Sequence, residues 1–263
     1  MTELRLGTQG FSYADWVGVF YPPESKPADY LRFYGQVFDT VELDTTFYST
    51  PRQSLVQAWA ENTPDGFLFS AKLPQVITHE KHLKDCGKDL DLFVSTMRLL
   101  GPKLGALLIQ CPPDLHIEEL PALQAFLPLL PRDVPFAIEF RHRSWLRDDV
   151  LDLLREYNVA WTVIDLYYMP RTPHITADFA YVRWLGDRRK ITQFDRIQID
   201  RSEQMATWAT TLQELALHTR RILGFYNNHY AGHSPASVRQ MQGLLHLPGV
   251  DPTTLWPRQD RLL

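Results

Sequence analysis

The stretch FAIEFRHRSW, residues 136–145, begins with an apolar run and then places Glu139, Arg141, His142 and Arg143 within five positions. The apolar run predicts a buried strand, because strands of a parallel sheet are covered on both faces and read as nearly continuous apolar segments. Charged residues at the end of such a strand indicate either that the chain emerges into an exposed loop or that the strand opens onto a site. Which of the two applies depends on the fold that the rest of the chain predicts.

Short apolar or β-branched runs of this kind recur along the chain and predict eight strands. They are LRLGT (4–8), TVELD (40–44), GFLFSAK (66–72), LGALLIQ (104–110), FAIEF (136–140), VAWTVID (159–165), FAYVRWL (179–185) and ILGFYNN (222–228). Helical patterns lie between most of them, with starts indicated at Thr50, Ser144, Ser202 and Ser234. Strands that alternate with helices predict an α/β fold with a parallel sheet. Eight such units in 263 residues favour a TIM-like (β/α)8 barrel, which typically needs roughly 250 residues.

The segment between the sixth and seventh strands departs from this alternation. LYYMPRTPHITAD, residues 166–178, carries two prolines and shows no helical period. Because proline disfavours the interior of a helix, we expect an irregular crossover between these two strands. No repeat, low-complexity tract or linker interrupts the chain, so we expect residues 1–263 to form a single barrel domain.

Composition limits the classes of function. The formal net charge of −4 and the isoelectric point near 6.1 do not give the basic footprint of a general nucleic-acid binder, although a local basic site for nucleic acid remains open. Two cysteines cannot form a disulfide framework, and neither a signal peptide nor a membrane-spanning run is visible. We therefore expect a cytoplasmic protein without a membrane partner. The first strand lacks a G-x-G-x-x-G motif, so no nucleotide cofactor is expected.

Polar side chains end every predicted strand, and in a barrel the carboxyl ends of all strands converge on one face. Alternation along the second and fifth strands turns Val41, Leu43, Ile138 and Phe140 outward, because the face covered by helices is the more apolar one. The remaining positions of these strands then point inward. The candidate catalytic residues are Glu42, Glu139 and Asp165, and the candidate substrate-binding residues are Lys72, Gln110, Arg141, His142, Arg183, Asn227, Asn228 and Tyr48.

These residue types indicate chemistry on an anion. The carboxylates, Asp44 among them, could transfer protons or hold a divalent cation, and arginine and lysine bind phosphate or carboxylate groups. The run Arg188, Arg189 and Lys190 follows the seventh strand, where barrels often bind phosphate. We expect an enzyme of the hydrolase, lyase or isomerase type acting on a phosphoester, nucleotide or sugar phosphate. Two alternatives stay open: a non-catalytic binding protein for nucleic acid or a phosphorylated metabolite, and a purely structural ion network.

Metal and nucleophile motifs are weak. The pairs His79 with His82 and His229 with His233 have ligand-like spacing, but no His-Glu-x-x-His motif is present. No metal ligand is therefore assigned, although a divalent metal ion as a cofactor remains open. No G-x-S-x-G motif marks a nucleophilic serine.

Several motifs, taken in order, resemble the YecE-like family. They are GTQGFSYADWVGVFYP (7–22), VELDTTFYSTP (41–51), FSAKLPQVITHEKHL (69–83), QCPP (110–113), IEFRHRSW (138–145), YVRWLG (181–186) and GFYNNHYAGHSPAS (224–237). The resemblance spans almost the whole chain and implies a TIM-like barrel, similar to those of apurinic endonucleases and xylose isomerases. It implies no established activity, because the family is defined as one of unknown function. Leu185 replaces the histidine that many relatives carry before the glycine of the seventh strand, so no ligand histidine is expected there.

Overall fold

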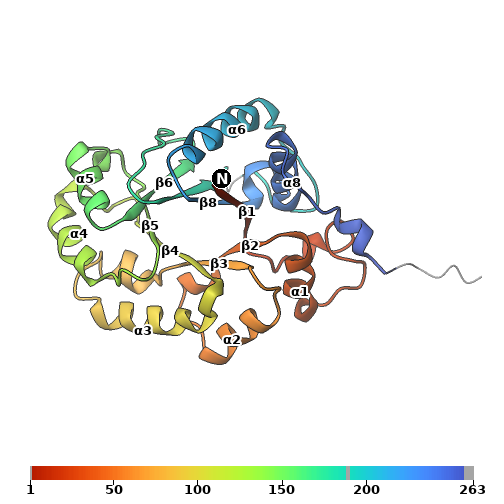
Figure 1. Cartoon of the computed structure of the whole chain (residues 1–263), viewed down its shortest axis with the longest axis horizontal. Helices are drawn as coiled ribbons and strands as arrows, with labels where there is room; N and C mark the ends of the chain where they lie inside the picture. Colours follow the sequence, from red (N-terminus) through yellow and green to blue (C-terminus); the bar gives the residue numbers. More distant parts are fainter. Residues whose placement is uncertain (1, 188–189, 258–263) are drawn as a thin grey trace, which may run out of the picture.

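Eight parallel strands close into a barrel in the computed structural model, which describes residues 2–187 and 190–257 (Figure 1). The strands are β1 (Glu3–Gln9), β2 (Thr40–Leu43), β3 (Leu68–Lys72), β4 (Leu104–Gln110), β5 (Phe136–Glu139), β6 (Val159–Asp165), β7 (Phe179–Trp184) and β8 (Arg221–Tyr226). Each pairs with the next along the chain, and β8 pairs with β1 to close the ring. This confirms the TIM-like barrel predicted from the eight apolar runs.

Helices surround the strands on the outside of the barrel (Figure 1). They are α1 (Pro27–Val37), α2 (Gln53–Glu61), α3 (Gly87–Met97), α4 (Leu120–Phe126), α5 (Asp148–Glu156), α6 (Ser202–Ala216), the short α7 (Asn228–Ala231) and α8 (Ser234–Leu244). Across the described ranges, no helix has the length and apolar character that a bilayer crossing requires.

The crossover from β6 to β7, residues 166–178, contains no helix, as its two prolines predict. Thr176 ties it to the sheet instead. Its hydroxyl donates to the carbonyl of Val159 at 2.6 Å and accepts from the backbone N–H of Trp161 at 2.7 Å. The chain therefore returns along β6 without forming a helix, whereas the other connections between strands contain one.

Two of the predicted boundaries differ from the structure because a side chain makes a hydrogen bond that the local sequence pattern does not show. The helix expected after Ser144 begins at Asp148, because the Ser144 hydroxyl accepts instead from the backbone N–H of Ile117 at 3.0 Å. The eighth strand ends at Tyr226 rather than at residue 228. Asn227 leaves the strand because its side chain accepts from the backbone N–H of His229 and caps α7.

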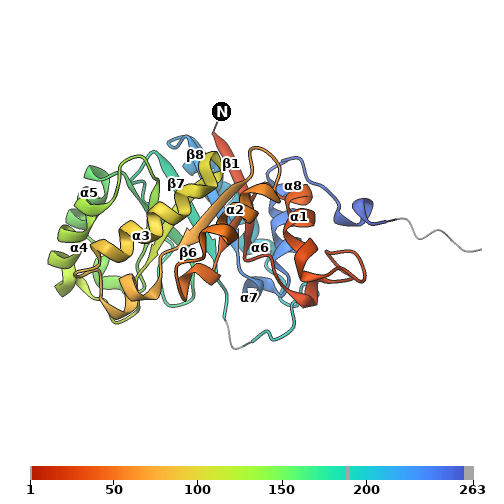
Figure 2. The ribbon, with the colours of Figure 1, turned by 90° about the horizontal axis from the view of Figure 1, so that it is seen from below.

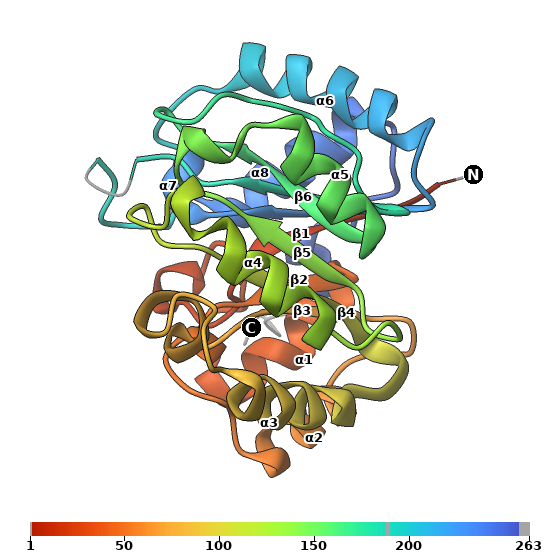
Figure 3. The ribbon, with the colours of Figure 1, turned by 90° about the vertical axis from the view of Figure 1, so that its left-hand side faces the viewer.

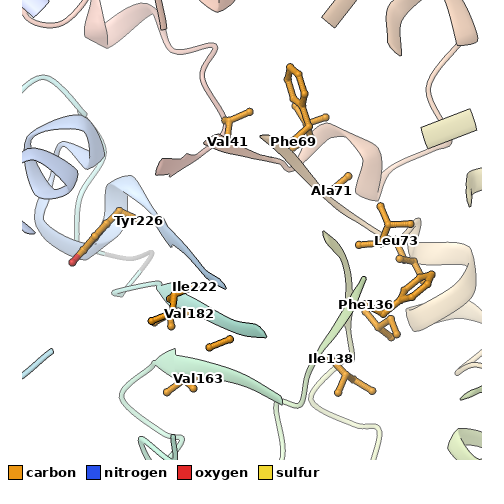
Figure 4. Close-up of a cluster of buried hydrophobic side chains, with 14 of the residues drawn as sticks. Val41, Phe69, Ala71, Leu73, Phe136, Ile138, Val163, Val182, Ile222 and Tyr226 are labelled. Carbon is orange, nitrogen blue, oxygen red and sulfur yellow. The ribbon is translucent and has the colours of Figure 1, made fainter. Parts of the chain in front are cut away.

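Side chains alternate between two apolar layers. Figure 4 shows Val41, Phe69, Ile138, Val163 and Val182 pointing away from the barrel axis, into the layer between strands and helices. The interior of the barrel is filled by a smaller cluster: Leu68, Ala106, Leu108, Ala137, Ala160, Ala177, Phe179, Tyr181, Leu223 and Phe225. The alternation predicted for the second and fifth strands is therefore correct.

The two ends of the barrel differ. Figures 2 and 3 place the start of β1 on one side of the molecule and α7 on the opposite side. The second side is the carboxyl end of the strands, where the barrel interior changes from apolar to charged residues.

Candidate functional site

One arginine lies inside the barrel, near the carboxyl ends of the strands. Arg183 of β7 is 2% exposed and bonds two glutamates that come from other strands. Its Nη2 and Nε donate to Oε1 of Glu42, on β2, at 2.7 and 3.2 Å. Its Nη1 donates to Oε2 of Glu139, on β5, at 2.6 Å. The guanidinium group therefore links three strands that are far apart in the sequence.

The remaining glutamate oxygens also have donors. The hydroxyl of Tyr181 donates to Oε2 of Glu42 at 2.7 Å, and Nε of Arg141 donates to Oε1 of Glu139. Each of the four carboxylate oxygens thus accepts a hydrogen bond, and both glutamates are fully buried. Buried charges persist only when they are paired and hydrogen-bonded in this way.

The two glutamates differ in proton affinity. Burial raises the pKa of Glu42, and the nearby charge of Asp44 adds to this effect, while Arg183 opposes it. Burial also raises the pKa of Glu139, but the charges of Arg141 and Arg183 together outweigh it and lower that pKa to about 2. Glu139 is therefore ionised at neutral pH, and Glu42 is the glutamate that holds a proton more readily.

A pocket of about 280 Å³ lies above this network, at the carboxyl end of the strands. Its lining is Gln110, Arg141, Leu166, Tyr167, Tyr168, Leu185, Gly186, Asp187 and Asn227. The side chain of Arg141 is 14% exposed, and besides Glu139 it contacts the Tyr168 hydroxyl from Nη1 at 3.4 Å. A guanidinium group has five N–H donors, and these two contacts leave donors for a molecule in the pocket.

A larger hollow of about 820 Å³ lies at the amino end of the barrel. Leu4 of β1, Leu212 of α6 and Leu245, which follows α8, contribute to its wall. Among the described residues that line it there is no carboxylate. Characterised barrel enzymes use the opposite face, so the smaller pocket beside Arg141 is the better candidate for chemistry.

Three more predicted residues lie at this end of the barrel. Gln110 and Asn227 line the pocket. The Nδ2 group of Asn227 also donates to Oε1 of Gln9 at 2.8 Å, so part of its side chain has a structural hydrogen bond. Lys72 lies at the end of β3, is 7% exposed and places Nζ over the ring of Phe47, 4.4 Å from its centre.

Four predicted residues lie apart from the pocket. His142 stacks on His116 with ring centres 3.9 Å apart, and Tyr48 is 74% exposed and does not line the pocket. Asn228 is buried, and its Oδ1 accepts from both the backbone N–H and the hydroxyl of Ser234.

Asp165 is the fourth, and it was proposed as catalytic. Its Oδ2 accepts from Nε1 of Trp208, on α6, at 2.6 Å, so it faces the helices. The reason is strand alternation, because Asp165 follows the outward residues Trp161 and Val163 at intervals of two. The structure therefore does not bring Asp165 together with Glu42 and Glu139.

Sequence reasoning missed the aromatic wall of the pocket. Tyr167 and Tyr168 come from the irregular crossover, and Asp187 comes from the loop after β7. Two consecutive tyrosines just beyond a strand end were an available signal. Of the basic run after β7, Arg188 and Arg189 lie outside the described residues, and Nζ of Lys190 is 3.9 Å from Asp187.

Within residues 2–187 and 190–257, no group of three or more His, Cys, Asp and Glu side chains is placed to hold a metal ion. The two histidine pairs have other partners. Nδ1 of His79 lies 2.8 Å from the Thr78 hydroxyl, Nε2 of His82 lies 4.0 Å from Asp114, and Nδ1 of His233 lies 2.8 Å from the carbonyl of Phe194.

Comparison with known proteins decides the family. Residues 5–260 match the family described as protein of unknown function DUF72. The chain belongs to the DUF72 family. Its relatives include UPF0759 protein YecE of Escherichia coli K12, 37% identical over 139 residues, and UPF0759 protein YunF of Bacillus subtilis, 30% identical over 150 residues. These matches cover 53% and 54% of this chain and 48% and 52% of the relatives, so the chain spans about half the length of the curated relatives it matches.

Solved structures of DUF72 proteins agree with the barrel. A DUF72 protein from Thermotoga maritima is 29% identical with a TM-score of 0.81, covering 93% of this chain and 99% of that one. A DUF72 protein from Enterococcus faecalis is 21% identical with a TM-score of 0.76, covering 94% and 99%. A D-psicose 3-epimerase, at 8% identity and a TM-score of 0.52, covers 92% and 95% and shares the fold alone. The YecE-like resemblance of the sequence is thereby confirmed.

Proposed function

We propose that this DUF72 protein is a cytoplasmic enzyme that binds a small anionic substrate, such as a nucleotide or sugar phosphate, in the pocket beside Arg141. The observation that carries the proposal is the way in which the guanidinium group of Arg141 is hydrogen-bonded. Glu139 accepts from its Nε, the Tyr168 hydroxyl lies 3.4 Å from its Nη1, and the residue lines the pocket. A fixed guanidinium group with free donors suits bidentate binding of a phosphate or carboxylate.

The two glutamates take different roles in this proposal. Glu139 is ionised and saturated with arginine donors, so it positions Arg141 and Arg183 and does not carry a proton. The raised pKa of Glu42 makes it the better candidate for acid and base catalysis. Tyr167 and Tyr168 supply aromatic walls against which the uncharged part of a substrate packs.

A non-catalytic binding protein is the second candidate, and one observation favours it. Every oxygen of Glu42 and Glu139 is already occupied, and neither glutamate touches solvent. Binding alone needs no movement of this network, whereas proton transfer through Glu42 requires its bonds to Arg183 or Tyr181 to rearrange. Asp187 in the pocket wall and the net charge of −4 both weigh against long nucleic acids as the ligand.

A thermal-shift screen tests the ligand class. Wild type, Arg141→Ala and the distant control Arg147→Ala are compared with inorganic phosphate, sugar phosphates, nucleotides and short oligonucleotides. A ligand at 100 times its Kd stabilises the folded state by about 2.7 kcal/mol, and we expect that stabilisation in wild type and Arg147→Ala but not in Arg141→Ala. Equal stabilisation of all three proteins would place the ligand elsewhere.

Turnover then separates the two candidate functions. With a ligand identified, Glu42→Gln in an enzyme should keep binding and lose rate by about 10²-fold or more. A ligand that binds through Arg141 but is never converted by wild type would favour the binding protein.

A further inference from the structure

Lys72 has a largely buried side chain whose amine finds no hydrogen-bonding partner among the described residues. The side chain is 7% exposed, and its described contact is the face of Phe47, 4.4 Å from Nζ to the ring centre. Among the described residues, no acceptor or carboxylate lies within bonding distance of Nζ. A protonated lysine has three N–H donors, and none of the described protein groups accepts from them, so the amine is open to a ligand.

Lys103 shows how this chain satisfies a partly buried lysine. Its Nζ donates to the carbonyls of Ala60 and Thr63, both at 2.6 Å, and lies 3.3 Å from the Thr63 hydroxyl. These acceptors lie at the end of α2. In the part of the chain that the structure describes, Lys72 has no such set of acceptors, so its amine is not fixed by the fold as that of Lys103 is.

Charged groups surround Lys72 from several strands. Burial lowers its pKa and the charge of Arg183 lowers it further, while Asp44, Glu42 and Glu139 act in the opposite direction; the balance lowers it. More of the neutral amine is therefore present near pH 7 than for an exposed lysine. Burial beside a second cation is a known way to activate a lysine as a nucleophile.

Asp44 supplies a proton acceptor near this amine, although beyond hydrogen-bonding distance of it. Its Oδ1 is buried without a hydrogen bond and lies 3.9 Å from Nη2 of Arg183. Among the charged residues that act on Lys72, Asp44 has the strongest effect. An amine that attacks a carbonyl group must lose protons, and the Asp44 oxygen can accept them through one intervening water molecule.

We propose that Lys72 is a nucleophile that forms an imine with a carbonyl group of the ligand bound beside Arg141. The inference rests on the proposed function and narrows its substrate class to small aldehydes or ketones that carry a phosphate or carboxylate. Lys72 ends β3 and Arg141 follows β5, with only β4 between them. Lys72 does not line the pocket itself, but Gln110, which ends β4, does, so a ligand that is held at Arg141 and extends past Gln110 approaches Lys72.

The chemical step balances without a redox partner. The lone pair of Nζ attacks the carbonyl carbon, a C–N bond forms, and one proton moves from nitrogen by way of Asp44 to the carbonyl oxygen. The resulting carbinolamine then loses its hydroxyl group as water: the second nitrogen proton moves by way of Asp44 to the departing hydroxyl group, and the C=N bond of the imine forms. One water molecule leaves, and no electrons are exchanged with another molecule.

Reductive trapping tests the inference on the intact protein. Glycolaldehyde and glycolaldehyde phosphate are added separately with cyanoborohydride, whose hydride reduces any imine to a stable secondary amine, and labelled lysines are mapped by peptide mass spectrometry. We expect Lys72 to be labelled ahead of the exposed Lys84, and we expect the adduct to disappear in Lys72→Arg and Lys72→Met but not in Lys84→Arg. Asp44→Asn should slow the labelling of Lys72. Labelling of Lys72 no faster than Lys84 with either aldehyde would overturn the inference.

The same experiment separates the two proposals. If Arg141→Ala lowers labelling by glycolaldehyde phosphate but not by glycolaldehyde, both the anion site and the nucleophile are supported. If phosphate stabilises wild type through Arg141 while Lys72 is not labelled preferentially, the nucleophile is wrong and the anion site stands. If Lys72 is labelled equally by both aldehydes with no effect of Arg141→Ala, the amine is reactive and the anion site is wrong.

Discussion

Nη1 of Arg183 donates to Oε2 of Glu139 at 2.6 Å inside the barrel, and both side chains are closed to solvent. The same guanidinium group bonds Glu42, so one cation compensates two carboxylates from distant strands. Arg141 lies above the pair, where it is held by Glu139 and borders the pocket. The charges at the end of FAIEFRHRSW therefore belong partly to a buried network and partly to a candidate site.

Replacing Arg183 by methionine should strongly destabilise the protein. The change leaves Glu42 and Glu139 buried with fewer partners, and breaking a buried ion pair in this way typically costs about 3–5 kcal/mol. Urea unfolding measures the loss. Arg147→Met is the control, because Arg147 pairs with Asp149 where both side chains are about half exposed, and its effect should be much smaller. Equal effects of the two changes would contradict the account of the network.

Glu139 should make stability fall in acid. The pKa of this carboxyl is about 2 in the folded protein against an ordinary 4.5, so the unfolded chain binds more protons between these values. The stabilisation is therefore present above about pH 4.5 and is lost as the pH falls toward 2. Unfolding free energies of wild type and Glu139→Gln across this range should differ most at the upper end and converge at the lower end. Parallel curves would show that Glu139 does not titrate in this way.

Tyr181→Phe should cost stability through one hydrogen bond. The hydroxyl donates to Oε2 of the buried Glu42 at 2.7 Å, and hydrogen bonds to charged groups contribute about 1.5–3 kcal/mol. Tyr48→Phe removes a hydroxyl from a ring that is 74% exposed and serves as the control. Thermal unfolding should show a lower Tm for the first variant and little change for the second. A Tm for Tyr181→Phe as high as that of the control would argue against a strong bond to Glu42.

Asp165→Ala should leave ligand binding intact. The carboxylate accepts from Nε1 of Trp208 on the helix side of β6, so its loss leaves that donor unpaired and lowers stability by roughly 1–3 kcal/mol. The thermal shift produced by a ligand that depends on Arg141 should be the same size as in wild type. If the variant instead keeps normal stability and shows no thermal shift with the ligand, Asp165 belongs to the binding site.

The barrel could be predicted because each strand corresponds to a short apolar run in the sequence. Apolar runs identified all eight strands, and alternation correctly turned Val41 and Ile138 outward. Boundaries failed where a side chain made a tertiary bond, as Ser144 does with the backbone of Ile117. Such bonds depend on segments that are distant in the sequence, so propensity alone does not reveal them.

The candidate site was predicted only in part. Polarity at the strand ends identified Glu42, Glu139 and Arg183, which alternation along each strand turns inward. The same rule, applied to the sixth strand, would have excluded Asp165. The position of Tyr168 could not be predicted, because an irregular crossover has no period from which the direction of a side chain follows.

Isothermal titration calorimetry with inorganic phosphate tests the central claim, that Arg141 forms an anion site at the barrel mouth, most directly. Wild type, Arg141→Ala and Arg147→Ala are titrated under the same conditions. We expect saturable binding to wild type and to Arg147→Ala, and a large loss of affinity in Arg141→Ala with its fold intact by circular dichroism. Phosphate binding of equal strength to all three proteins, or none to wild type, would contradict the claim.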